Sequence, residues 1–121
     1  MAYTIVQEKR GALVVHADKV IFNDMMGAIM SIHSNPDYAL FRYVIHDMLQ
    51  AQLDFSAVDM TVIVSHEIGA RYTNPNIKIA VVTVDDTMVT YSRNFAKITK
   101  AEVEIFSNVA AARQWVEAAD L

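Results

Sequence analysis

Six residues with side chains suited to acid–base or metal chemistry lie near the predicted carboxyl ends of strands: His16, Asp18, His46, Asp47, Asp85 and Asp86. In open α/β sheets that edge is where ligands bind. Imidazole and carboxylate groups could hold a divalent metal there or move protons. Their spacing matches no diagnostic motif, which favours the simpler interpretation of solvated strand ends and helix caps. Asp85 or Asp86 is suited to cap a helix that begins at Thr87.

Ser56 is a second candidate. It follows the run "VIHDMLQAQLDF" and precedes Asp59 by three residues, a capping box with Asp in place of the usual Glu. A phosphate on Ser56 would gain from a helix N-terminus, but Asp54 and Asp59 would repel it. The residues therefore favour a plain N-cap over a phosphorylation site.

Other motifs are weaker. Arg71, Arg93 and Lys97 could form a basic patch for an anionic headgroup or a phosphorylated partner, although solvated cations at helix ends explain them more simply. His66 and Glu67 begin a zincin-like motif, but Ala70 occupies the position of its second histidine. The glycines are isolated, and no serine lies in a nucleophile elbow. The sequence therefore predicts no catalytic residue, no bound metal and no cofactor.

Composition narrows the class of protein. A chain of 121 residues with 54% hydrophobic and 20% charged residues predicts one folded domain over 1–121. It has no cysteine, so disulfides and thiol catalysis are excluded. The net charge of −4 argues against nucleic-acid binding. No apolar run is long enough to span a bilayer, and the first ten residues do not resemble a signal peptide. We expect a cytoplasmic domain with no stable membrane insertion.

The first half of the chain predicts two strands around a charged turn within 3–18, with Gly11 at a positive φ. A helix over 22–33 follows, capped by Asn23, and then a strand over 39–48. The segment 56–75 has conflicting signals, because Thr61 to Val64 have high β propensity. Its length and the box at Ser56 favour a helix that ends before Pro75.

The second half begins with a continuous apolar run over 76–85, typical of a strand buried on both faces. An amphipathic helix follows over 86–100, with Met88, Tyr91, Phe95 and Ile98 on one face. A short strand over 101–106 leads to a last helix over 107–120, capped by Ser107, with Val109, Ala112, Val116 and Ala119 on its buried face. The order β-β-α-β-α-β-α-β-α predicts an α/β fold, with a mixed, mostly parallel sheet of about five strands and four main helices.

Two helices contain more apolar residues than one face needs, the helix over 22–33 and the helix that contains "MTVIV". Met25, Met26 and Met30 crowd the first. Such methionines suit an adaptable binding surface, although filling of the core is the simpler interpretation. The excess of apolar side chains predicts a subunit interface, most simply that of a C₂ homodimer.

This order of elements, with its motifs, resembles the STAS-like (SpoIIAA-like) domains, which include the anti-sigma factor antagonists and many small uncharacterised bacterial proteins. The resemblance covers nearly the whole chain. It rests on "VIHDMLQAQLDFSAVDM" as strand, Asp, loop, Asp, Ser and helix, on "IKIAVVTVDD" before an amphipathic helix, and on "VEIFSNVAAARQWV" at the end.

The resemblance implies a bacterial, non-enzymatic regulatory or protein-interaction domain. In the antagonists a partner kinase phosphorylates the serine that Ser56 matches. Here Ala57, Val58 and Asp59 stand where the antagonists usually have a small, glycine-containing stretch. The second possibility is a carrier of a lipid or small apolar ligand, because the related CRAL-TRIO-like lipid-transfer domains share this architecture. An enzyme that uses the strand-end His and Asp groups is the third.

Overall fold

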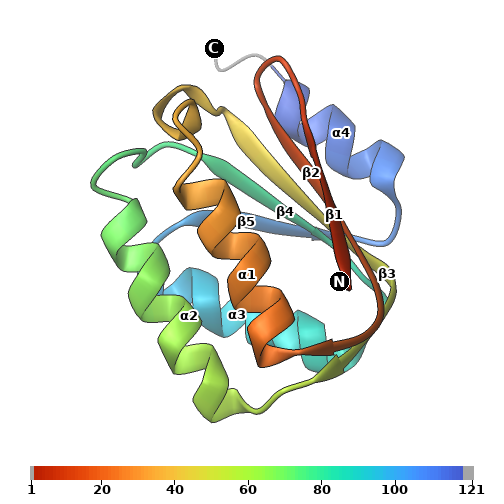
Figure 1. Cartoon of the computed structure of the whole chain (residues 1–121). Coiled ribbons are helices and arrows are strands. Elements are labelled where there is room, and N and C mark those ends of the chain that lie inside the picture. Colours follow the sequence, from red (N-terminus) through yellow and green to blue (C-terminus); the bar gives the residue numbers. More distant parts are fainter. Residues whose placement is uncertain (1, 119–121) are drawn as a thin grey trace.

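A five-stranded mixed sheet forms the centre of the molecule in the computed structural model, which describes residues 2–118 (Figure 1). Its strands are β1 (Tyr3–Gln7), β2 (Gly11–Ile21), β3 (Tyr43–Asp54), β4 (Lys78–Val82) and β5 (Glu102–Phe106). They lie in the order β1-β2-β3-β4-β5. Strand β1 runs antiparallel to β2, and every other neighbouring pair is parallel. The predicted mixed, mostly parallel sheet is confirmed.

Helices cover both faces of this sheet. They are α1 (Phe22–His33), α2 (Ala57–Ala70), α3 (Asp86–Thr99) and α4 (Val109–Glu117), with a 3₁₀ turn, η1, over Tyr38–Leu40. Helices α1, α2 and α3 lie on one face, and α4 lies on the other (Figure 1). Alternate residues of β3 and β4 serve the two layers: Val44 and Ile79 pack under α1–α3, whereas Ile45 and Ala80 pack under α4. Strand β4 is therefore buried along its whole length, as its apolar run predicts.

Strands β2 and β3 extend further than the sequence predicts. Their parallel register continues past a bulge between Val15 and Ala17 and ends where Ile21 pairs with Asp54. The segment after Asp47 is thus part of β3, although the STAS-like pattern placed a loop there. His16 and His46 consequently lie within strands and not at their carboxyl ends. Polar residues such as Gln50 and Gln52 hid this extension, because one strand face is open to solvent here.

The predicted start of β3 at Ala39 is also wrong, because residues 38–40 form η1. The buried side chain of Asn74 donates hydrogen bonds to the carbonyl oxygens of Tyr38 and Phe41, at 2.8 and 2.7 Å. These bonds hold the turn in place, so the chain does not become extended until Tyr43.

Two predicted caps are wrong as well. Ile21, not Asn23, is the N-cap of α1, and its N–H donates to the Asp24 carboxylate at 3.3 Å. Asn108, not Ser107, caps α4, where its side chain accepts a hydrogen bond from the Ala111 N–H at 2.8 Å. The cap of α1 lies two residues before the expected position and that of α4 one residue after it, which is the usual uncertainty of such boundaries.

The buried faces of α3 and α4 follow the helical spacing with two qualifications. Ile98 of α3 is 59% exposed, and Ser92 and Thr99 are buried in its place. Ala112 and Val116 of α4 are buried as predicted, and Ala119 lies outside the described residues.

Gly11 does not have the positive φ that the turn predicts. It is required for a different reason, because a Cβ on Gly11 would collide with the carbonyl oxygen of Tyr43 on the paired strand. Gly69, by contrast, lies in exposed helix, and a Cβ there would meet nothing within 4 Å.

These two glycines make a matched pair of tests. Gly11→Ala should lower the free energy of unfolding by about 1–3 kcal/mol, because backbone must move to admit the methyl group. Gly69→Ala should raise it by about 0.5–1 kcal/mol through higher helix propensity. Urea denaturation followed by circular dichroism measures both. Equal effects of the two substitutions would contradict the close β2–β3 contact.

Candidate functional site

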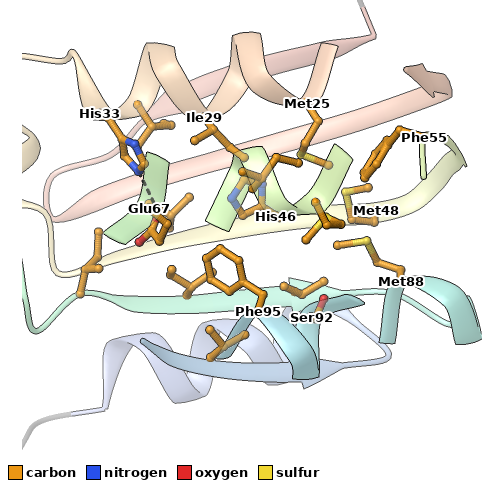
Figure 2. Close-up of a pocket in the computed structure, with 18 of the residues that line it drawn as sticks. Met25, Ile29, His33, His46, Met48, Phe55, Glu67, Met88, Ser92 and Phe95 are labelled. Atoms are coloured by element: carbon orange, nitrogen blue, oxygen red, sulfur yellow. Dashed lines mark ion pairs between the residues drawn. The ribbon is translucent and has the colours of Figure 1, made fainter. Parts of the chain in front are cut away.

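A cavity of about 70 Å³ lies between the sheet and helices α1, α2 and α3 (Figure 2). Most of its wall is apolar, with Met25, Met48, Met60, Met88, Phe55 and Phe95 among the lining residues. Five polar or ionisable residues also line it: His33, Tyr38, His46, Glu67 and Ser92. Apolar walls and ionisable groups converge in this cavity, which is the usual character of a binding site.

The first ionisable element of this site is a pair of histidines from adjacent strands. His16 Nε2 and His46 Nδ1 lie 3.0 Å apart, and the two rings stack with centroids at 5.3 Å. The bulge in β2 at His16 accompanies this contact. Burial lowers the pKa of His16 to about 4. Burial and the neighbouring His16 lower the pKa of His46 to about 3. Both rings are therefore neutral near pH 7, and one donates a hydrogen bond to the other.

The second element joins α1 to α2. His33 Nε2 lies 3.0 Å from Glu67 Oε2, and His33 Nδ1 lies 2.8 Å from His66 Nδ1. The His33 and His66 rings stack at 4.8 Å. In the tautomer in which His33 Nε2 donates to the carboxylate, His33 Nδ1 accepts a hydrogen bond from His66. Burial and the neighbouring His33 lower the pKa of His66. The four histidines of the chain thus form two hydrogen-bonded pairs beside the cavity.

Three buried polar atoms at the cavity wall have no hydrogen-bond partner among residues 2–118: the Tyr38 hydroxyl, Glu67 Oε1 and the Ser92 hydroxyl. An unpaired buried polar group costs about 1–3 kcal/mol. Burial, together with the Glu67 charge, raises the pKa of Tyr38, so its hydroxyl keeps its proton and can donate. The cavity therefore offers one acceptor and two hydroxyl groups to whatever occupies it.

Of the six residues first considered for metal or acid–base chemistry, the structure brings only His16 and His46 into contact. Asp18 is exposed with a φ of 60°. Asp47 accepts a hydrogen bond from the Leu49 N–H at 3.1 Å. Asp85 caps α3, and Asp86 is exposed in its first turn. Within residues 2–118, no group of three or more His, Asp or Glu residues is arranged to hold a metal ion.

Ser56 lies at the N-cap of α2, on the exposed surface. Its hydroxyl accepts a hydrogen bond from the Asp59 N–H at 3.2 Å, and the Asp59 carboxylate accepts one from the Ser56 N–H at 3.0 Å. These reciprocal bonds are a complete capping box. Asp54, which precedes the helix, pairs with Lys19 at 3.6 Å.

The three basic residues of the suggested anion patch differ in their contacts and exposure. The Arg71 guanidinium donates to the carbonyl oxygen of Thr99 at the end of α3, and Arg71 is partly buried. Arg93 and Lys97 are exposed one turn apart on α3. Arg71 therefore connects the ends of α2 and α3, and it does not stand open to solvent beside the other two.

Sequence reasoning missed four of the five polar residues of the cavity: His33, Tyr38, Glu67 and Ser92. Two signals were present. His33 falls on the apolar face of the helix over 22–33, seven residues after Met26, and Ser92 falls one turn after Met88. A polar residue on an otherwise apolar helix face indicates a buried polar contact, but it does not name the partner.

No helix within residues 2–118 has the length and apolar character needed to cross a membrane. The sequence matches no protein-family model, and no curated protein matches it. Two solved structures are similar in fold. The anti-sigma factor antagonist SpoIIAA in its unphosphorylated form is 9% identical, with a TM-score of 0.67 over 98% of this chain and 100% of that chain. An uncharacterized DUF3478-family protein with a SpoIIAA-like fold, from Shewanella loihica PV-4, is 12% identical, with a TM-score of 0.62 over 95% and 92%.

The chain therefore has a SpoIIAA-like fold, as its sequence pattern predicts. The identities are too low to carry more than the fold. The cavity does not favour the lipid carrier, because pockets for drug-sized ligands measure about 300–1,000 Å³ and this one measures about 70 Å³.

The histidine pair predicts a loss of stability in mild acid. In the unfolded chain both histidines take up protons near pH 6.5, whereas in the fold they do so only near pH 4 and 3. Stability is therefore retained above pH 6.5 and is lost as the pH falls toward these values. Between pH 7.5 and 5 the expected loss is about 2 kcal/mol for each histidine.

Urea denaturation at a series of pH values measures this slope. His46→Gln removes one of the two titrating groups, so the slope of the variant should be roughly half as steep. An unchanged slope would mean that other groups cause the acid sensitivity.

The capping box predicts the effect of changes at Ser56. Ser56→Ala should lower the free energy of unfolding by about 0.5–2 kcal/mol, and Ser56→Asp should restore most of it, because Asp caps as well as Ser does. Thermal and urea denaturation of the three proteins test this. If Ser56→Ala costs nothing, the cap does not explain the residue, and phosphorylation becomes the stronger interpretation.

Proposed function

We propose that this chain is a non-enzymatic regulatory domain that acts by binding protein, and that the outer face of α2 is its binding surface. The observation that carries the proposal is the exposure of large apolar side chains on that face. Val58 is 74% exposed, Val62 50% and Ile68 42%, and Tyr72, in the turn directly after the helix, is 89% exposed. Between Thr61 and Gly69 every exposed position of the helix is uncharged. Because α2 also buries Ile63, Val64 and Glu67 against the domain, it is apolar on both sides.

A second copy of the chain fits this surface. In an antiparallel pair of α2 helices with a two-fold axis at Ser65, Val58 would lie opposite Tyr72 of the partner subunit, and Val62 opposite the partner's Ile68. The apolar side chains are placed symmetrically about Ser65, seven and three residues to each side. The absence of charge removes repulsion between identical surfaces, and the small residues Thr61, Ser65 and Gly69 allow close approach. Such self-complementarity is what an isologous C₂ interface requires.

The similarity of fold supports the general class of this proposal. SpoIIAA is described as an anti-sigma factor antagonist, a protein whose action is on another protein. We carry over only that class, a bacterial cytoplasmic domain that regulates through protein contact. The outer face of α2 adjoins the Ser56 cap, so a change at that cap would lie beside the proposed interface.

Light scattering and native mass spectrometry of the intact chain test the interface. The wild type should be a dimer at micromolar concentration. Val62→Glu should shift it to monomer, with at least a tenfold weaker association, because each introduced carboxylate would be buried without a partner against the apolar Ile68 of the partner subunit. Thr90→Glu adds the same charge at an exposed position of α3 and should leave the dimer intact. A monomeric wild type, or a dimeric Val62→Glu variant, would refute the α2 interface.

A further inference from the structure

The charged and polar groups of the cavity are unevenly distributed. His33 and Glu67 lie together at one end in Figure 2, His46 lies in the middle, and Ser92 lies apart from the first two, near Met88. Tyr38 belongs to the Glu67 end, since its ring lies 5.0 Å from that of His33 and its hydroxyl feels the Glu67 charge. Tyr38 is 3% exposed and Glu67 4%, and each has an unpartnered oxygen at the cavity. An acceptor and a donor thus belong to the same end of the cavity, both without a partner.

The charges around Glu67 define which head group suits this end. Glu67 Oε2 already pairs with His33, so a cationic ligand would compete with that histidine for one carboxylate. An anionic ligand would be repelled by Glu67. A neutral hydroxyl group meets both free partners, because it can donate to Glu67 Oε1 and accept from the Tyr38 hydroxyl. A ligand without a donor would leave the carboxylate oxygen buried and unpaired.

The walls define the rest of the ligand. Four of the chain's seven methionines, Met25, Met48, Met60 and Met88, line the cavity, together with Phe55 and Phe95. Methionine side chains are unbranched and flexible, so such a wall can adjust to an irregular apolar body. The volume of about 70 Å³ admits a molecule of a few heavy atoms, and it is roughly half of a cavity that accepts benzene.

We propose that this cavity is a binding site for a small neutral molecule with a short apolar body and one hydroxyl group. The hydroxyl hydrogen-bonds Glu67 Oε1 and the Tyr38 oxygen, and the body lies among the methionines toward Ser92. The site is on the inner side of α2, and the proposal is independent of whether the outer side binds protein.

The test uses ethanol and its isomer dimethyl ether, which have the same atoms, but the ether has no donor. Both have only three heavy atoms, which suits the volume of the cavity. Acetate is the anionic comparison. Each is titrated into the intact chain labelled with ¹³C at the methionine methyl groups. The alcohol should shift the signals of the cavity methionines and leave those of Met26 and Met30, which do not line the cavity. The alcohol should bind at least about tenfold more tightly than the ether, and acetate should not bind.

Two variants locate the head group. Tyr38→Phe removes an unpartnered hydroxyl that can donate to the oxygen of either ligand. It should leave the fold intact and weaken the binding of the alcohol and of the ether alike, by about threefold or more, while the preference for the alcohol remains. Ser92→Ala removes the unpartnered hydroxyl at the other end and should leave the affinity for the alcohol unchanged. Unshifted Met26 and Met30 signals in each variant show that the fold is retained. Equal binding of alcohol and ether, or no shift with any of the three compounds, would overturn the proposal, the latter leaving a cavity that holds water only.

Discussion

A carboxylate placed in the apolar layer between sheet and helices sets the main constraint on this domain. Glu67 is 4% exposed, so bulk water does not solvate it, and its carboxylate must find partners inside the domain. His33 of α1 contacts one of its oxygens, and His66, the residue before Glu67 in α2, hydrogen-bonds His33. The orientation of α1 relative to α2 is therefore fixed by a polar contact and not by apolar packing alone.

The cavity follows from the same constraint. Close packing of apolar side chains against Glu67 would leave both of its oxygens without hydrogen bonds, whereas only Oε1 is unpaired here. The space beside it allows water or a ligand group to reach that oxygen and the Tyr38 hydroxyl. The pair His16 and His46, on β2 and β3, forms the adjoining wall. Burial keeps both rings neutral, so the pair adds no second charge beside Glu67.

Much of the fold could be predicted from the sequence, because the elements follow from period and propensity. The apolar run of β4 and the amphipathic pattern of α3 needed no tertiary information. The extent of β3 did require tertiary information, because Gln50 and Gln52 look like loop residues in the sequence but pair with β2 on a partly solvated strand. Gly11 shows the same limit: a turn signal suggested backbone conformation, whereas the cause is contact with Tyr43, a residue 32 positions away in the chain.

The site was harder to predict, because its contacts join residues about thirty positions apart. His16 and His46 were named for a shared sheet edge, and they meet instead in mid-strand across a parallel register with a bulge. Glu67 was read only as part of an incomplete metal motif. The burial of Glu67 could not be predicted from hydrophobic periodicity. Helix α2 is apolar on both sides, so the sequence does not distinguish its inner face from its outer face.

That ambiguity of α2 has a physical consequence. Ile63 and Glu67 face the cavity side, and their chain neighbours Val62 and Ile68 are exposed on the other side. A helix of fourteen residues moves largely as a rigid unit, so a displacement by an occupant of the cavity would move the outer face as well. Thermodynamic linkage then requires reciprocity. If an occupant of the cavity changes the association constant of the outer face by some factor, association changes the affinity of the cavity for that occupant by the same factor. A helix whose two faces are both apolar is suited to connect the two sites, because neither face is tied to solvent by charge.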